Sequence, residues 1–105
     1  MDISSQKQLI SNQLLEMEQR LAKINWDLTQ ARSKDFEEQA TERENDEVLE
    51  EIARETTDSI KRLKVALQKI NDGSYGECES CGETIQDERL KALPDTSLCV
   101  RCAAG

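Results

Sequence analysis

A regular alternation of apolar and polar positions runs through the first third of the chain. The apolar positions are spaced alternately four and three residues apart, and they are Ile10, Leu14, Met17, Leu21, Ile24, Leu28 and Ala31. This spacing is typical of a long amphipathic helix that packs along a narrow seam against a second helix. The pattern therefore predicts a helix over this stretch.

A second seam with the same spacing follows, at Leu49, Ile52, Thr56, Ser59, Leu63, Ala66 and Ile70. Its middle is weaker, because Thr56 and Ser59 replace large apolar side chains, and Ile60 and Leu67 widen its second half. The two seams together predict a mainly α fold built on a pair of coiled-coil helices.

The two helices can pair in two ways. In an antiparallel hairpin, facing seam residues have numbers that add to 80, which puts the midpoint at Ala40. The alternative is a parallel dimer of one continuous helix, since no Pro or Gly interrupts residues 2–70. Ser33 and Asp35 are residue types that cap helix N-termini, and Glu38 stands in the capping-box position, which favours a break. We therefore expect an antiparallel hairpin over 1–70 with its tip near 33–45.

Turn-forming residues end the second helical pattern. Asn71-Asp72-Gly73-Ser74 and Gly76 supply this turn chemistry, and residues 71–105 form the remaining piece. A piece of about 35 residues lies below the ~40 at which a hydrophobic core alone usually suffices. We expect it to depend on a bound metal for folding.

Four cysteines provide the ligands for that metal. Cys78 and Cys81 form one C-x2-C pair, Cys99 and Cys102 form another, and 17 residues separate the pairs. This spacing indicates a tetrahedral zinc site, in which four thiolates fill the coordination shell and leave no position for a catalytic water. Gly82 permits the positive φ that turns backbone N–H groups toward sulfur. We predict one structural Zn²⁺ per chain.

Two other readings of the cysteines remain open at this point. The pairs could form disulfides, or one pair could be a redox site like that of thioredoxin. The expected cytoplasmic location argues against disulfides, and the lack of a strand-helix-strand pattern argues against the redox site.

The charge balance excludes several functions. The chain of 105 residues has a net charge of −8, which opposes binding to nucleic acid phosphates and anionic membranes, so no sequence-specific DNA binding is expected. It has no histidine, which excludes His-based catalysis.

The net charge is concentrated in one segment. Residues 35–51 hold nine acids against one base and so carry the net charge of −8, while acids and bases balance in the rest of the chain. No apolar run reaches the roughly 20 residues of a membrane span, and no signal peptide is evident, so we expect a cytoplasmic protein without membrane contact.

A resemblance to a known family rests on the cysteine region. The stretch from Gly76 to Cys102, with Arg89-Leu90 and Ala92-Leu93-Pro94 between the cysteine pairs, closely resembles the DksA/TraR-type zinc finger. The resemblance implies a coiled-coil hairpin before the finger and binding to RNA polymerase. It further implies that the hairpin enters the secondary channel of the polymerase and alters initiation at selected promoters.

The family has the tip motif Asp-x-x-Asp-x-Ala, which is matched here by Asp35, Glu38 and Ala40. Glu38 replaces the second Asp and is one methylene longer. By this resemblance the carboxylates approach the catalytic Mg²⁺ of the polymerase or the basic residues around it, and the small Ala40 allows a close approach.

The chain departs from longer family members in two respects. Those members have a C-terminal helix after the last cysteine pair, whereas this sequence stops at Gly105. Members that respond to ppGpp have basic residues at the positions of Arg62, Leu93 and Ala103, and only Arg62 is basic here. We expect either independence from ppGpp or a different arrangement, and we take Arg62 as a candidate nucleotide or polymerase contact.

The leading hypothesis is a monomeric transcriptional regulator without catalytic activity of its own. A transcript-cleavage factor acting in the same channel and a generic zinc-ribbon and coiled-coil adaptor remain as alternatives. Trp26 is expected at the edge of the hairpin, either packed against the second helix, which we favour, or in contact with a partner, and Tyr75 is expected where the finger meets the helices.

Overall fold

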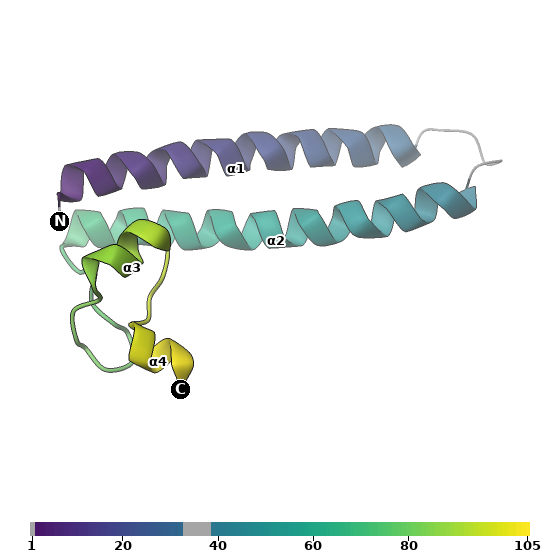
Figure 1. Cartoon of the computed structure of the whole chain (residues 1–105). Helices are drawn as coiled ribbons and strands as arrows, with labels where there is room; N and C mark the ends of the chain where they lie inside the picture. Colours follow the sequence, from purple (N-terminus) through teal and green to yellow (C-terminus); the bar gives the residue numbers. More distant parts are fainter. Residues whose placement is uncertain (1, 33–38) are drawn as a thin grey trace. The chain divides into compact units, whose positions relative to one another are not determined.

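The protein consists of two long helices followed by a small irregular domain with two short helices (Figure 1). The computed structural model describes the backbone of residues 2–32 and 39–105 and the side chains of residues 2–30 and 47–105. Within these ranges the helices are α1 (Ile3–Arg32), α2 (Gln39–Asp72), α3 (Asp87–Ala92) and α4 (Val100–Ala104). The only strand-like pairing in the described part is one isolated antiparallel bridge between Glu77 and Thr84. The predicted mainly α fold with a helical hairpin is confirmed.

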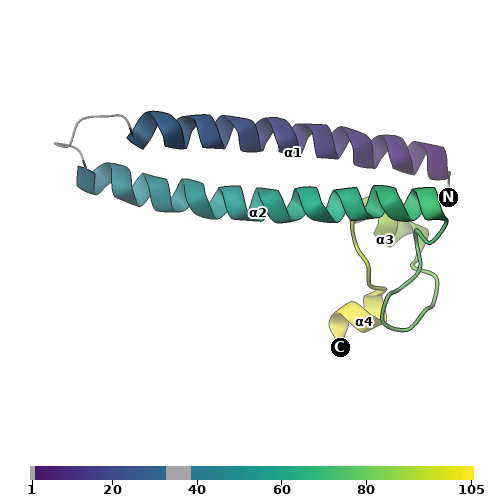
Figure 2. The same cartoon turned by 180° about the vertical axis from the view of Figure 1, so that it is seen from behind.

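Contacts divide the chain into two units. The finger unit comprises Met1–Leu14 and Lys61–Gly105, and the hairpin unit comprises Leu15–Ile60. In each unit the segments of α1 and α2 lie side by side and run in opposite directions (Figure 2).

The predicted seams supply the buried side chains between these helices. In the finger unit Ile10, Leu63 and Ala66 are buried, and in the hairpin unit the buried residues are Ile24, Leu28, Thr56 and Ile60. Thr56 is tolerated there because its hydroxyl donates a hydrogen bond of 2.7 Å to the Ile52 carbonyl oxygen, which satisfies the polar group. Ile52 itself is partly exposed, and Ile60 supplies buried apolar surface in that unit.

The connection between α1 and α2 begins within the predicted tip range of 33–45, but the midpoint predicted from the seams does not match it. Helix α1 ends at Arg32 and α2 begins at Gln39, so Ala40 lies in the first turn of α2 and not at the midpoint of the hairpin. A continuous helix is likewise wrong. The physical reason is that a heptad pattern coincides with itself after a shift of seven residues. A constant of 73 in place of 80 still pairs five of the seven positions of the first seam with positions of the second, from Ile10 with Leu63 to Ile24 with Leu49, and its midpoint lies between residues 36 and 37, inside the connection.

The predicted packing of Trp26 against the second helix is also wrong, because 62% of this residue is exposed.

The end of α2 follows the prediction. The helix stops at Asp72, and Gly73 adopts a φ of 83°, in the left-handed region that glycine enters without steric cost. Among the helices that the structure describes, none combines the length and the apolar character needed to cross a membrane.

Candidate metal centre

The first cysteine pair lies on a tight turn. The Cys78 amide donates to the Glu83 carbonyl oxygen at 2.8 Å, and the Gly82 amide donates to the Cys78 carbonyl oxygen at 2.9 Å. Gly82 has a φ of 77°, where a side chain would be strained even though nothing crowds the position. The positive φ predicted for Gly82 is confirmed.

The second pair is positioned by the start of α4. Cys99 is the N-cap residue of this helix, and its carbonyl oxygen accepts a hydrogen bond of 2.9 Å from the Ala103 amide. Cys102 follows within the helix. The two cysteine loops are tied together by the Glu79 amide, which donates to the Ser97 carbonyl oxygen at 2.9 Å.

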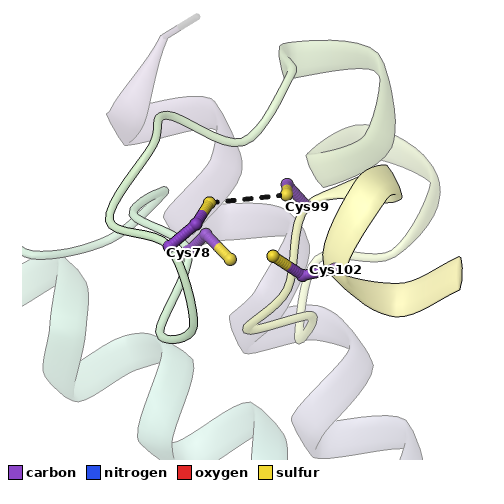
Figure 3. Close-up of side chains that lie close together, drawn as sticks. Cys78, Cys99 and Cys102 are labelled. Atoms are coloured by element: carbon purple, nitrogen blue, oxygen red, sulfur yellow. Dashed lines mark hydrogen bonds between the residues drawn. The ribbon is translucent and has the colours of Figure 1, made fainter. Parts of the chain in front are cut away.

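These two loops bring the four sulfur atoms together. All four Sγ atoms lie within 4.8 Å of one another, and the Sγ atoms of Cys81 and Cys99 are 3.8 Å apart. Figure 3 shows the side chains of Cys78, Cys99 and Cys102 converging from the two loops. With Zn–S bonds of about 2.3 Å, a regular tetrahedron requires sulfurs about 3.8 Å apart. The arrangement therefore fits a single tetrahedral zinc ion.

The electrostatics of the cluster also favour a dication. Backbone N–H groups of Cys99 and Cys81 lower the pKa of the Cys78 thiol to about 6. In contrast, the neighbouring sulfurs, Cys99 first, raise the pKa of Cys102 to about 12. Four thiolates cannot ionise together at this spacing without a positive charge between them, and Zn²⁺ supplies that charge.

A small apolar cluster lies beneath the cysteines. Cys78, Ile85 and Leu90 are almost fully buried, and the partly buried residues packed against them are Tyr75, Leu98, Cys99 and Cys102. Because three of these seven residues are metal ligands, the core and the metal site are one structure. This agrees with the expectation that the finger folds around its metal.

A buried hydrogen-bond network joins the start of α1 to the finger, and sequence reasoning missed it. Gln6 is 4% exposed, and its amide donates to the Leu90 carbonyl oxygen at 2.6 Å and to the Tyr75 hydroxyl at 3.1 Å. The Tyr75 hydroxyl donates in turn to the Pro94 carbonyl oxygen at 2.9 Å. The regular spacing of the seam continues backward from Ile10 to Lys7 and Ile3 and passes Gln6 by, so no signal in the seam marks this residue. Tyr75 packs against the finger core and accepts the hydrogen bond from Gln6 of α1, so it lies where the finger meets the helices, as predicted.

Two ion pairs join α2 to the finger loops. Arg62 contacts Asp95 at 2.9 Å, and Lys69 contacts Glu79 at 2.6 Å. Both pairs line a cavity of about 190 Å³ beside Val65. More than half of the Arg62 side chain is exposed, so it is available to a partner while also pairing with Asp95.

The other predicted residues are distributed as follows. Leu93 and Ala103 are exposed on the finger. Asp35 and Glu38 lie outside the described residues, and for Ala40 only the backbone in α2 is described. The contact predicted for these three tip residues stays a prediction.

Comparison with known families assigns most of the chain. Residues 6–70 match the N-terminal domain of the DnaK suppressor protein-like family, and residues 73–105 match the prokaryotic dksA/traR C4-type zinc finger. The chain belongs to the DksA/TraR family. Together with the converging thiolates, this confirms a C4 site for one structural Zn²⁺.

Individual relatives support the assignment. The chain is 38% identical to a DnaK suppressor protein from Agrobacterium tumefaciens, whose solution structure matches with a TM-score of 0.69 over 99% of this chain and 93% of that one. The DksA2 structure from Pseudomonas aeruginosa matches with a TM-score of 0.90 over 97% of this chain and 80% of that one, and at 21% identity it shows the fold alone. The RNA polymerase-binding transcription factor DksA of Escherichia coli is 44% identical over 43 residues, 41% of this chain and 28% of that protein.

The curated relatives are longer than the aligned region. The matches cover 66%, 37% and 28% of three of them.

Proposed function

We propose that this protein is a transcriptional regulator that binds RNA polymerase through protein contacts and has no catalytic activity of its own. In this proposal a single copy in the cytoplasm inserts its hairpin connection into the secondary channel and modulates initiation. Family membership supports the proposal, as does the name of the Escherichia coli relative, an RNA polymerase-binding transcription factor.

The observation that carries the proposal is the location of the charge. Nine acids against one base lie in residues 35–51, and the connection between α1 and α2 falls at the start of this segment. A carboxylate-rich end is attracted to a Mg²⁺ ion or to the basic residues around it. Within this end Asp35 and Glu38 are the proposed acidic contacts, and Ala40 is small enough to pass close to moving parts of the enzyme.

The finger unit would then provide the docking surface. Acidic and basic side chains balance in this unit, and Arg62 is paired with Asp95. The unit therefore offers polar contacts rather than a DNA-binding patch. Of the three positions that the resemblance connects with ppGpp, only Arg62 is basic, so we propose no ppGpp response of the usual arrangement.

The first experiment is a pull-down with purified core polymerase at moderate salt. Co-purification is expected, and its absence would leave only an adaptor unrelated to polymerase. The second is transcription from a responsive promoter with Asp35→Asn and Ala40→Thr. Both variants should bind polymerase nearly as well as the parent and lose the effect on transcription.

Glu47→Gln is the matched control, because it removes one charge from the same acidic segment outside the tip motif. It should regulate like the parent. If Asp35→Asn and Ala40→Thr also regulate like the parent, the tip contact is refuted. A backtracked elongation complex separates the cleavage alternative, because only a cleavage factor shortens the RNA.

A further inference from the structure

The middle of α2 contains a run of five residues with low helix propensity, Thr56-Thr57-Asp58-Ser59-Ile60. The residues before and after this run, 49–55 and 61–64, are almost all strong helix formers. The run is nevertheless helical, because α2 continues to Asp72. It is therefore the part of this stretch in which the amino acids themselves stabilise the helix least.

Two threonine side chains in this run compete with the backbone of the helix. The hydroxyls of Thr56 and Thr57 each donate a hydrogen bond of 2.7 Å to the carbonyl oxygen four residues earlier in the chain. In an α-helix these two carbonyls also accept the amides of residues 56 and 57. Sharing a carbonyl in this way destabilises a helix slightly and favours bending.

The packing around this run is also thin. Among the described side chains from 47 to 59, only that of Thr56 is buried, and it is polar. Ile52, the preceding seam residue, is 38% exposed. In the register with a constant of 73 these two residues face Met17 and Leu21 of α1, which are only partly buried. A helical segment with few buried apolar contacts has a low free energy of local opening.

We propose that residues 52–60 of α2 are an opening segment, in which the backbone hydrogen bonds break and re-form while the helix on either side stays intact. A sharp bend in a helix needs Pro, Gly, a π-bulge or a group that inserts into the hydrogen-bond ladder. Neither Pro nor Gly occurs between residues 39 and 72. The two threonine hydroxyls are the groups that can interrupt the ladder here.

The position of the opening segment indicates what it does. It directly follows the acidic segment 35–51, which holds nine acids against one base. Opening at 52–60 lets this charged segment change direction at a lower cost than the bending of a fully bonded helix. The inference goes beyond the proposed function and does not depend on it, because it concerns the protein without a partner.

The test is native-state hydrogen exchange of the zinc-loaded full chain, measured by NMR in a series of low urea concentrations. The amides of residues 56–60, which bond to the carbonyls of 52–56, should exchange at least about tenfold faster than those of 63–67. Their rates should stay constant at low urea, because local opening exposes little surface. The rates for 63–67 should rise with urea, since their exchange requires a larger unfolding.

Two outcomes overturn the proposal. In the first, the amides of 56–60 exchange as slowly as those of 63–67, or their rates rise equally steeply with urea. In the second, protection falls steadily from residue 60 to residue 51. That result is expected when α2 frays from its end, whereas opening within the helix leaves the amides of 51–55 more protected than those of 56–60.

Thr56→Leu should close the segment. It removes a hydroxyl that competes for a backbone carbonyl, and it places an apolar, strongly helix-forming residue in the seam opposite Met17. The exchange of the amides of 56–60 should slow by about tenfold or more. Thr29→Leu is the matched control, because Thr29 is exposed on α1 and its hydroxyl makes the same kind of bond, to the Asn25 carbonyl oxygen at 2.9 Å. It should leave those rates within about twofold.

Asp58→Ala keeps the test decisive if the leucine does not fit at position 56. Asp58 is exposed, so this change raises helix propensity without altering the packing. It should slow the exchange of the amides of 56–60 by about twofold to threefold, with unchanged helix content by circular dichroism. If neither Thr56→Leu nor Asp58→Ala slows this exchange more than Thr29→Leu does, the opening segment is refuted.

Discussion

The buried contact between Gln6 and Tyr75 allows a quantitative prediction. Gln6→Met keeps the length of the side chain but removes both amide donors, so the Leu90 carbonyl and the Tyr75 hydroxyl each lose a partner. A net hydrogen bond contributes about 0.5–1.5 kcal/mol, and a buried group left unpaired costs about 1–3 kcal/mol. We expect Gln6→Met to lower the free energy of unfolding of the finger unit by about 2–3 kcal/mol.

Tyr75→Phe acts on the same network from the other side. It removes the acceptor of Gln6 and the donor to the Pro94 carbonyl oxygen, and Pro94 is buried. The expected loss is about 2 kcal/mol. Because the two substitutions share one hydrogen bond, the double variant should lose about 1 kcal/mol less than the sum of the single losses.

The assay is urea unfolding at a fixed free zinc concentration, followed by far-UV circular dichroism and by hydrogen exchange of the finger amides. Gln8→Met is the matched control, because Gln8 is exposed and its side chain bonds only locally, to Asn12 at 3.0 Å. Its effect should stay within about 0.5 kcal/mol. If Gln6→Met is as mild as Gln8→Met, or if the double variant is additive, the network does not hold the finger to α1.

Three further predictions concern the finger and the turn that connects it to α2. Cys78→Ser should reduce zinc below one ion per chain in native mass spectrometry and expose residues 73–105 to proteolysis, whereas Glu83→Gln, an exposed residue in the same loop, should retain the metal. Gly82→Ala should destabilise the zinc-bound protein by about 1–2 kcal/mol, measured by thermal unfolding, because φ at this position is 77°. The Ser74 hydroxyl and amide lower the pKa of the Asp72 carboxyl. The stabilisation that the ionised Asp72 gives the folded protein is therefore present above the ordinary carboxyl pKa, and it is lost as pH falls through the lowered pKa. Ser74→Ala should raise that pKa in an NMR titration, and an unchanged value would contradict this assignment.

Much of the fold followed from short-range patterns. The heptad seams predicted α1 and α2, and Gly73 marked the end of α2, because side-chain periodicity and backbone φ are local properties. The zinc ligands could also be predicted from local sequence, since each C-x2-C pair places two thiolates on one turn.

The wrong predictions concern long-range register and packing. Ala40 was placed at the turn because a repeating seam fits several registers, and the helix ends that select one are set by packing. Trp26 was placed against α2 because an aromatic residue near a seam usually packs, yet its angular position leaves it on the outer side of α1.

The sequence by itself determined which segments are helical, which four residues hold zinc and where the net charge lies, because each depends on residues close together in the chain. Only the tertiary structure decided that Gln6 is buried. Its partners Leu90 and Tyr75 lie 84 and 69 residues away, and no local pattern reports contacts at that separation. The same holds for Arg62 and Asp95, whose ion pair exists because the finger folds back beside α2.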